Sequence, residues 1–125
     1  MTVPVFVLVA LAGGAGATVR FLLDRAIRAR TGAAFPLGTV LINCSGSLLL
    51  GVIAGLAARA VLPEAVHLVA GTGFLGGYTT FSAASVETVA LLAGRRGALA
   101  VLNGLVVPVV TVLLAAVGLG IAAIG

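Results

Sequence analysis

Four long apolar segments make up most of this chain and leave only short polar connections between them. They cover approximately residues 3–23, 37–58, 65–93 and 98–123. A chain of 125 residues has too much surface for its volume to hide apolar side chains on this scale from water. An apolar helix of about 20 residues spans the hydrocarbon core of a bilayer. The segments therefore predict an all-α integral membrane protein with four transmembrane helices in a single domain, residues 1–125.

The few charged residues indicate how the chain is oriented in the membrane. Only 8% of the residues are charged, and every cation is an arginine. The connections after the first and third segments contain Arg25, Arg28, Arg30, Arg95 and Arg96, against Arg59 alone after the second. Arginine excess marks cytoplasmic loops, so we predict that both termini lie outside the cytoplasm and that no nucleic acid is bound. The first segment imitates a signal peptide but lacks a basic start, and we interpret it as a membrane span.

Residues that carry enzyme chemistry are scarce and scattered. The chain has one histidine, one cysteine and three acidic residues, and they are scattered over apolar segments and connections. No nucleophile–base pair and no cluster of metal ligands can be assembled from them. Cys44 lies in an apolar segment, and we interpret it as a small packing residue. The sequence therefore predicts a protein that is not an enzyme.

The second segment carries a polar stripe on one face of its predicted helix. Thr39, Asn43 and Ser47 follow one another at intervals of four residues. An asparagine in the middle of a membrane is costly unless it is used. The stripe has two interpretations: hydrogen bonding between packed helices, or the lining of a polar pathway.

The stretch GGYTTFSAAS, residues 76–85, interrupts the third apolar segment with glycines and hydroxyl side chains. Gly76 and Gly77 weaken a helix, and Thr79 and Thr80 can bond the backbone groups that a break sets free. Broken membrane helices line cavities or lie buried in protein, and their free carbonyls can coordinate a cation. A glycine kink for helix packing is the alternative, but it needs fewer such residues. We therefore predict that the third helix is broken here.

Three stretches of the chain resemble the signature segments of the Fluc/CrcB fluoride channel family: GGAGATVRF, PLGTVLINCSGSLLLG and GFLGGYTTFSAASVET. Their order and spacing match, so the resemblance covers nearly the whole chain, and GGxTTFS is its most specific part. The resemblance implies a fluoride-selective channel that passively exports fluoride across the inner (plasma) membrane. It also implies an antiparallel dual-topology dimer with two pores, surrounded by lipid, and a central structural sodium ion (Na+).

The resemblance also implies roles for individual residues. The backbone carbonyls of Gly76 and Thr79 would hold the sodium ion. In the fluoride pathway, Asn43 would contribute its amide and Phe81 the edge of its ring. Hydroxyls would come from Thr39, Ser82 and Ser85, and Arg20 would place its guanidinium in the aqueous vestibule. From its position alone, Arg20 can also be an interfacial residue whose charged end reaches the headgroups.

One position departs from the family pattern. The family usually has a second phenylalanine in TTFSxFS, and this chain has Ala84 there. A homodimer would then lack half of its ring edges, and the arginine bias favours a single orientation. Two arrangements therefore stay open. The chain can form a homodimer, or it can pair with a paralogous subunit of opposite orientation and be the non-conducting partner in that pair. Asn103 and Thr111 in the fourth segment are left without a role.

A different class of protein also fits four short spans. Small multidrug-resistance-like transporters pair in antiparallel fashion and couple transport to protons. They need a carboxylate embedded in the first span, and residues 3–23 contain none. A proton-coupled transporter is therefore the alternative function.

Overall fold

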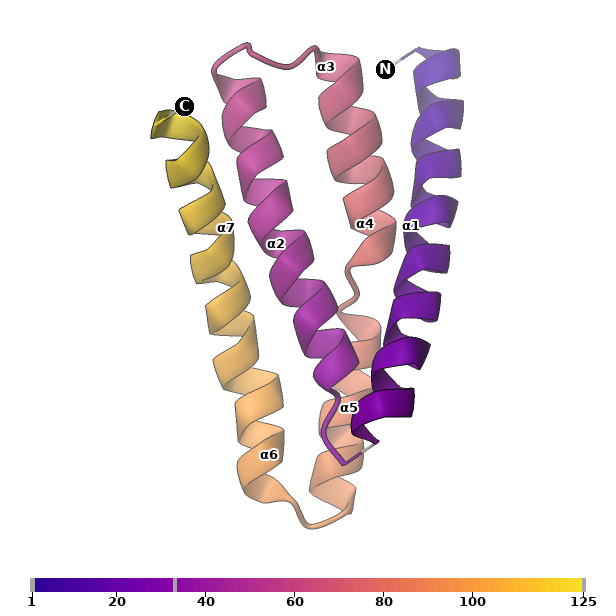
Figure 1. Cartoon of the computed structure of the whole chain (residues 1–125), viewed down its shortest axis with the longest axis vertical. Helices are drawn as coiled ribbons and strands as arrows, with labels where there is room; N and C mark the ends of the chain where they lie inside the picture. The colour runs from indigo at the N-terminus through magenta and orange to yellow at the C-terminus, as the bar shows by residue number, and fades with distance from the viewer. Residues whose placement is uncertain (1, 33, 125) are drawn as a thin grey trace.

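The computed structural model describes residues 2–32 and 34–124, and within these ranges it contains helices, short connections and no strand (Figure 1). The elements are α1 (Val3–Thr31), α2 (Leu37–Ala58), α3 (Glu64–Val66), η1 (His67–Leu75), α4 (Gly76–Tyr78), α5 (Ser82–Ala93), α6 (Gly97–Val101), η2 (Leu102–Val106) and α7 (Val107–Ile124). The two η elements are stretches of π-helix, whose wider turns often occur at functional sites.

These elements form four roughly parallel columns. The first two columns are α1 and α2, and the fourth is α6 with η2 and α7. The third column consists of α3, η1 and α4, followed after a short interruption by α5 (Figure 1). The two chain ends lie at the end of the molecule where α2 leads into α3. The sequence prediction of an all-α architecture is confirmed.

Three helices among the described residues are long and apolar enough to cross a membrane: Val3–Thr31, Leu37–Ala58 and Gly97–Ile124. Large apolar side chains cover the outside of the molecule, and few side chains are fully buried. Since lipid is the solvent that accepts such a surface, the chain is a multi-pass membrane protein. The third column is not one continuous helix of this kind.

Helix α1 is longer than the first apolar segment. We predicted a polar loop from Asp24 onward, but the helix continues to Thr31. Between Asp24 and Gly32 no glycine or proline interrupts the helix. Gly32 has a φ of 78°, which residues with a Cβ atom rarely adopt. Arg28 and Arg30 lie in the last turn, where positive charge stabilises a helix end.

Glycines allow two pairs of columns to touch backbone to backbone. Along α1, a Cβ atom added at Gly16 would collide with the carbonyl oxygen of Phe74 in η1. Along α7, a Cβ atom added at Gly118 would collide with the carbonyl oxygen of Leu48 in α2. Such close approaches of small residues are the usual basis of helix association in membranes.

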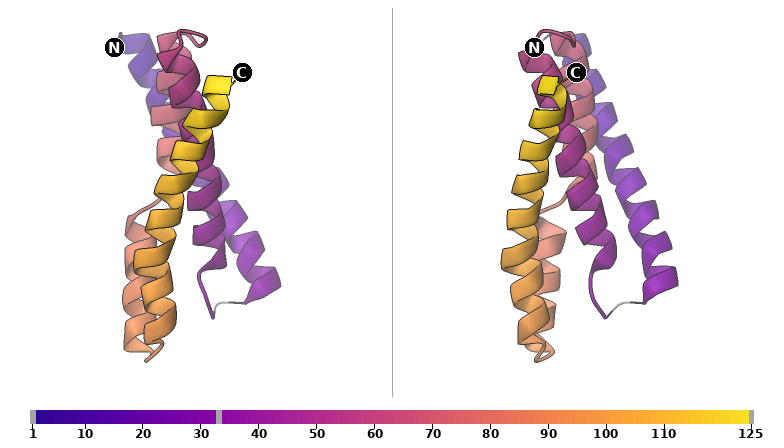
Figure 2. Two further views of the ribbon diagram at one scale, coloured as in Figure 1. Left: turned by 90° about the vertical axis from the view of Figure 1, so that its left-hand side faces the viewer. Right: turned by 60° about the vertical axis from the view of Figure 1, so that its left-hand side comes forward.

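The third column changes its packing partners at its interruption. Above it, η1 and α4 pack against α1, whereas below it α5 packs against α6 and η2. Figure 2 shows α1 diverging from the fourth column toward the end where α5 lies. The interruption therefore lies where the molecule opens.

Candidate functional site

The interruption of the third column consists of Thr79, Thr80 and Phe81. Thr79 is extended, with φ −81° and ψ 157°, and α5 begins at Ser82. Gly76, by contrast, has helical dihedral angles, with φ −61° and ψ −39°. Gly77 also lies within α4, where a Cβ atom would collide with the carbonyl oxygen of Gly13. Gly77 therefore lets α1 come close, and the residues from Thr79 onward leave the helical path.

Asn43 of α2 binds the backbone of Thr80 on both sides. Its Nδ2 donates to the Thr80 carbonyl oxygen at 2.8 Å, and its Oδ1 accepts the Thr80 N–H, also at 2.8 Å. The side-chain amide thus replaces two backbone bonds that a helix would have made. Nδ2 carries a second hydrogen, for which the described residues provide no acceptor.

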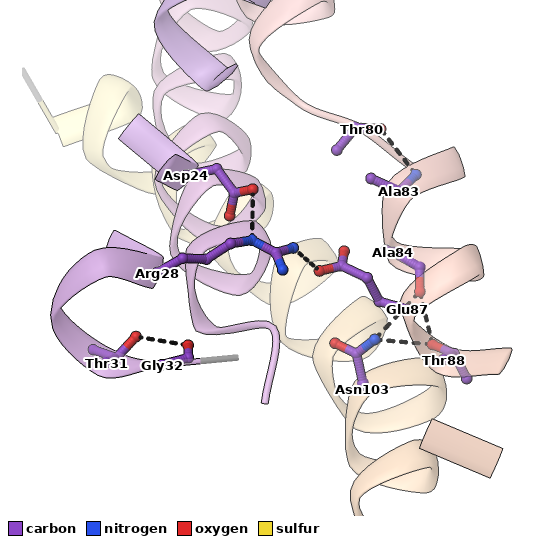
Figure 3. Close-up of polar contacts among 10 residues, drawn as sticks. All are labelled: Asp24, Arg28, Thr31, Gly32, Thr80, Ala83, Ala84, Glu87, Thr88 and Asn103. Carbon is purple, nitrogen blue, oxygen red and sulfur yellow. Dashed lines mark hydrogen bonds and ion pairs between the residues drawn. The ribbon is translucent and has the colours of Figure 1, made fainter. Parts of the chain in front are cut away.

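Backbone carbonyls lose their helical donors at the interruption, and those of Gly76 and Thr79 are two of them. In a continuous helix the Thr80 N–H would bond to the Gly76 carbonyl, and the Ala83 N–H would bond to the Thr79 carbonyl. Here the Thr80 N–H goes to Asn43, and the Ala83 N–H donates to Thr80 Oγ1 at 3.2 Å (Figure 3). The two carbonyls predicted to be sodium ligands are therefore among those at the interruption that no helical N–H closes; the Gly77 carbonyl, which accepts from Arg20, is another.

The open carbonyl oxygens are suitable ligands for a hard cation such as sodium. Carbonyl oxygens at half-helix ends are known cation ligands in membranes. The described residues contain no group of three histidine, cysteine or acidic side chains that could hold a metal ion. Any cation at the interruption would therefore be held by neutral oxygens, such as backbone carbonyls and hydroxyls, and not by a cluster of those side chains.

Arg20 of α1 lies against the end of α4. Its Nε donates to the Gly77 carbonyl oxygen at 3.3 Å, and the contact is partly buried. A positive group stabilises the C-terminal end of a helix, so Arg20 caps α4. From the sequence we considered a vestibular or interfacial arginine and missed this contact.

A groove of about 410 Å³ lies beside the interruption, among α2, α5, η2 and α7. Of the predicted site residues, it brings together Asn43, Thr79, Phe81 and Ser85. Further polar side chains that line it are Ser47, Thr80, Thr88, Asn103 and Thr111. Of the remaining predicted residues, Thr39 is buried and Ser82 is exposed, and neither they nor Arg20 and Gly76 line the groove.

The ring of Phe81 is uncovered in the single chain. Its exposed fraction is 83%, although it lines the groove. Its carbonyl oxygen accepts the hydroxyl of Ser85 at 2.9 Å. Ser82 lies on the same turn, with its Oγ 3.3 Å from Thr80 Oγ1.

Asn103 of η2 is a groove residue to which the sequence pattern assigned no role. It is 2% exposed, and its Nδ2 donates to Thr88 Oγ1 at 2.9 Å and to the Ala84 carbonyl at 3.3 Å (Figure 3). Thr88 in turn donates to the same carbonyl at 2.8 Å. A lone asparagine in an apolar segment was visible in the sequence, but its partners lie on another column.

An ion cluster joins α1 to α5 next to this network. Arg28 Nε lies 3.0 Å from Asp24 Oδ2, and Arg28 Nη2 lies 2.8 Å from Glu87 Oε2 (Figure 3). In the sequence analysis, Arg28 was used only to predict which side of the membrane its loop faces. Because Glu87 is 59 residues away, the pair could not be read from local sequence.

The fold and the groove together define a multi-pass helical membrane protein with a polar site at an interrupted column. The family described as "CrcB-like protein, Camphor Resistance (CrcB)" matches residues 7–121. The chain belongs to this family, as the resemblance in its sequence predicted.

Curated relatives support the same membership. A protein of Leifsonia xyli subsp. xyli named "Fluoride-specific ion channel FluC 1" is 46% identical over 121 residues, which cover 97% of this chain and 87% of that one. "Fluoride-specific ion channel FluC 2" of Mycobacterium tuberculosis (strain H37Rv) is 46% identical over 116 residues, covering 93% and 88%. "Fluoride-specific ion channel FluC" of Novosphingobium aromaticivorans is 50% identical over 99 residues, covering 78% and 75%.

Proposed function

We propose that this chain is a fluoride-selective channel that lets cytoplasmic fluoride leave the cell passively, and not an enzyme. The observation that carries the proposal is the groove in which Asn43 and hydroxyls from α5 and α7 meet at the interruption. Fluoride is small and strongly hydrated, so a pathway must replace its water with hydrogen-bond donors. The names of the relatives assign this ion to them.

Within this proposal, Asn43 offers its second amide hydrogen to fluoride. Phe81 offers the positive edge of its ring, and Ser85 offers a hydroxyl, and all three line the groove. Thr39, Ser82 and Arg20 stay predicted pathway residues from the family resemblance. Asn103, with its amide turned to α5, joins the groove as a wall residue.

We further propose that α3, η1, α4 and α5 form one broken membrane span and that a structural sodium ion lies at its interruption. The carbonyls of Gly76 and Thr79, together with their counterparts in a second subunit, would hold it. The ion would supply positive charge between helix ends that carry negative partial charge. The diverted N–H groups of Thr80 and Ala83 support this assignment.

The site needs a second subunit in this proposal. Phe81 is largely uncovered in the single chain, and an aromatic ring at mid-span that closes a pore needs protein against it. An antiparallel copy of the chain or a paralogous subunit of opposite orientation would supply that surface. The numbered names FluC 1 and FluC 2 of two relatives are consistent with the existence of paralogous subunits.

Selective flux is the first test of the channel proposal. The purified chain in liposomes, with a suitable partner if needed, should release fluoride at least about 100-fold faster than chloride under an electrical driving force, a preference of about 2.8 kcal/mol. An ion-selective electrode measures the release. Equal release of both ions would contradict the proposal.

A strict requirement for a proton gradient would instead favour the multidrug-type transporter. Such a transporter uses an embedded carboxylate in its first helix. In α1 the carboxylate is Asp24, which lies near the helix end and is paired with Arg28. We therefore expect fluoride release that is independent of a proton gradient.

The Ala84→Phe variant tests the partner arrangement. Ala84 lines the groove, and a phenylalanine there would restore the usual second ring edge. If the chain is one of an oppositely oriented pair, the unaltered chain alone should give little flux, and Ala84→Phe should raise it severalfold. Cysteines placed at the termini, after removal of Cys44, should be accessible from one side of the membrane only.

The opposite result is equally clear. Termini on both sides of the membrane in comparable amounts, with full flux from the unaltered chain, would overturn the paired-subunit arrangement. The channel would then be a homodimer that works without the second ring. Ser85 or Thr88, which line the same groove, would be the donors that replace it.

A further inference from the structure

We infer that Thr80 is the positioning residue that keeps the two sodium-binding carbonyls open. The inference rests on the proposed sodium site, to which Thr80 itself contributes no ligand. Its own N–H is held by Asn43 and does not close the Gly76 carbonyl, and its Oγ1 diverts the Ala83 N–H that would otherwise close the Thr79 carbonyl.

The polar atoms of Thr80 are all engaged outside the helical pattern. Asn43 holds both its N–H and its carbonyl, each at 2.8 Å. Its Oγ1 accepts the Ala83 N–H at 3.2 Å and lies 3.3 Å from Ser82 Oγ. This is a side-chain cap at the start of α5, of the kind by which threonine competes with a helix for backbone donors.

The neighbouring threonine is arranged differently. Thr79 Oγ1 donates to the Leu75 carbonyl at 2.9 Å, one turn back along the column. Its hydroxyl therefore stays with η1 and α4, while its own carbonyl is left for the cation. The two threonines thus have different roles. Thr79 supplies a carbonyl ligand, and Thr80 binds the Ala83 N–H that would otherwise compete for that carbonyl.

Removing Thr80 Oγ1 has a defined consequence. The Ala83 N–H, which is partly buried, would lose its acceptor, and leaving a donor without a partner away from water is costly. In a longer α5, the Thr79 carbonyl would accept the Ala83 N–H. That hydrogen bond would extend α5 toward its N-terminal end and would remove one oxygen ligand from the cation.

The experiment is a sodium titration of thermal unfolding in lipid nanodiscs, with a bulky organic cation keeping the ionic strength constant. For the unaltered protein, the unfolding midpoint should rise with sodium, because a ligand that binds the folded state stabilises it. Thr80→Val, which has nearly the same shape, should need about tenfold more sodium for the same rise, the effect of one hydrogen bond. Thr80→Ser keeps the acceptor and should stay within about twofold.

Two further variants make the result specific. Thr72→Val is the same substitution at an exposed position of η1, and it should titrate as the unaltered protein does. Ala83→Pro lies in the first turn of α5, where proline is tolerated. It removes the competing N–H, so adding it to Thr80→Val should restore the sodium response.

The outcomes separate the two proposals. If the unaltered protein shows no sodium-dependent midpoint, the sodium site itself fails, and the inference fails with it. If the unaltered protein responds but Thr80→Val titrates identically, the role of Thr80 is overturned and the site stands. If Thr80→Val does not fold, a double variant with Ala83→Pro that folds and binds sodium normally supports the mechanism, and one that folds without a response overturns it.

Discussion

Replacing Asn43 with leucine is expected to reduce fluoride flux at least about 100-fold in protein that still assembles. The substitution removes a donor from the proposed pathway and both bonds to the Thr80 backbone. A hydrogen bond to a charged group contributes roughly 1.5–3 kcal/mol, and a tenfold change in rate needs about 1.4 kcal/mol. The loss of the fluoride contact together with a displaced Thr80 therefore gives two orders of magnitude or more.

Liposome efflux with a fluoride electrode measures this effect. Cys44→Ala changes the next residue of the same helix, which does not line the groove, and should keep full flux. Size-exclusion chromatography checks that the Asn43 variant has the assembly state of the parent. Unchanged flux in a correctly assembled variant would assign Asn43 to helix packing, the interpretation that the sequence also allowed.

Replacing Gly118 with valine is expected to destabilise the contact between α2 and α7 severely. A side chain there would collide with the backbone at Leu48, Gly51 and Val52. Backbone atoms cannot move aside as a flexible side chain can, so α7 must shift. Overpacking of this kind costs roughly 1–3 kcal/mol and occasionally more, and we expect a large fall in the yield of monodisperse protein and in the unfolding midpoint.

Gly120 provides the matched control on the same helix. A Cβ atom there would meet no heavy atom within 4 Å, so Gly120→Val introduces the same side chain without a collision. Thermal unfolding of the two variants in the same nanodiscs separates packing from helix propensity. Equal midpoints would show that the contact between α2 and α7 is not as close as described.

The architecture was largely predictable because it depends on local and additive properties. Apolar segments of sufficient length favour membrane spans wherever they lie in the chain, and three of the four predicted segments correspond to such helices among the described residues. The cluster of hydroxyl residues after Gly77 indicated a disturbed helix, and the structure interrupts the column at Thr79–Phe81. Prediction failed at the end of α1, where charged residues suggested a loop, because charge does not stop a helix and Gly32 does.

The candidate site was predictable in its residue types but not in its contacts. An asparagine on a polar stripe and a TTFS stretch are enough to suggest ion chemistry. Their pairing could not be predicted, since Asn43 and Thr80 are 37 residues apart and Arg20 and Gly77 are 57 apart. The position of Asn103 in the groove was equally unpredictable, because it depends on hydrogen bonds to α5, which is distant in the sequence.

By itself, then, the sequence determined a helical membrane protein, because hydropathy and length act segment by segment. It also indicated a disturbance within residues 76–85, because backbone preference is local, but the structure keeps Gly76 and Gly77 helical and interrupts the column only at residues 79–81. Only the tertiary structure decided that the Thr80 N–H leaves the Gly76 carbonyl open. That N–H is taken by Asn43 of α2, and the meeting of the two residues is set by helix packing, which no single segment specifies.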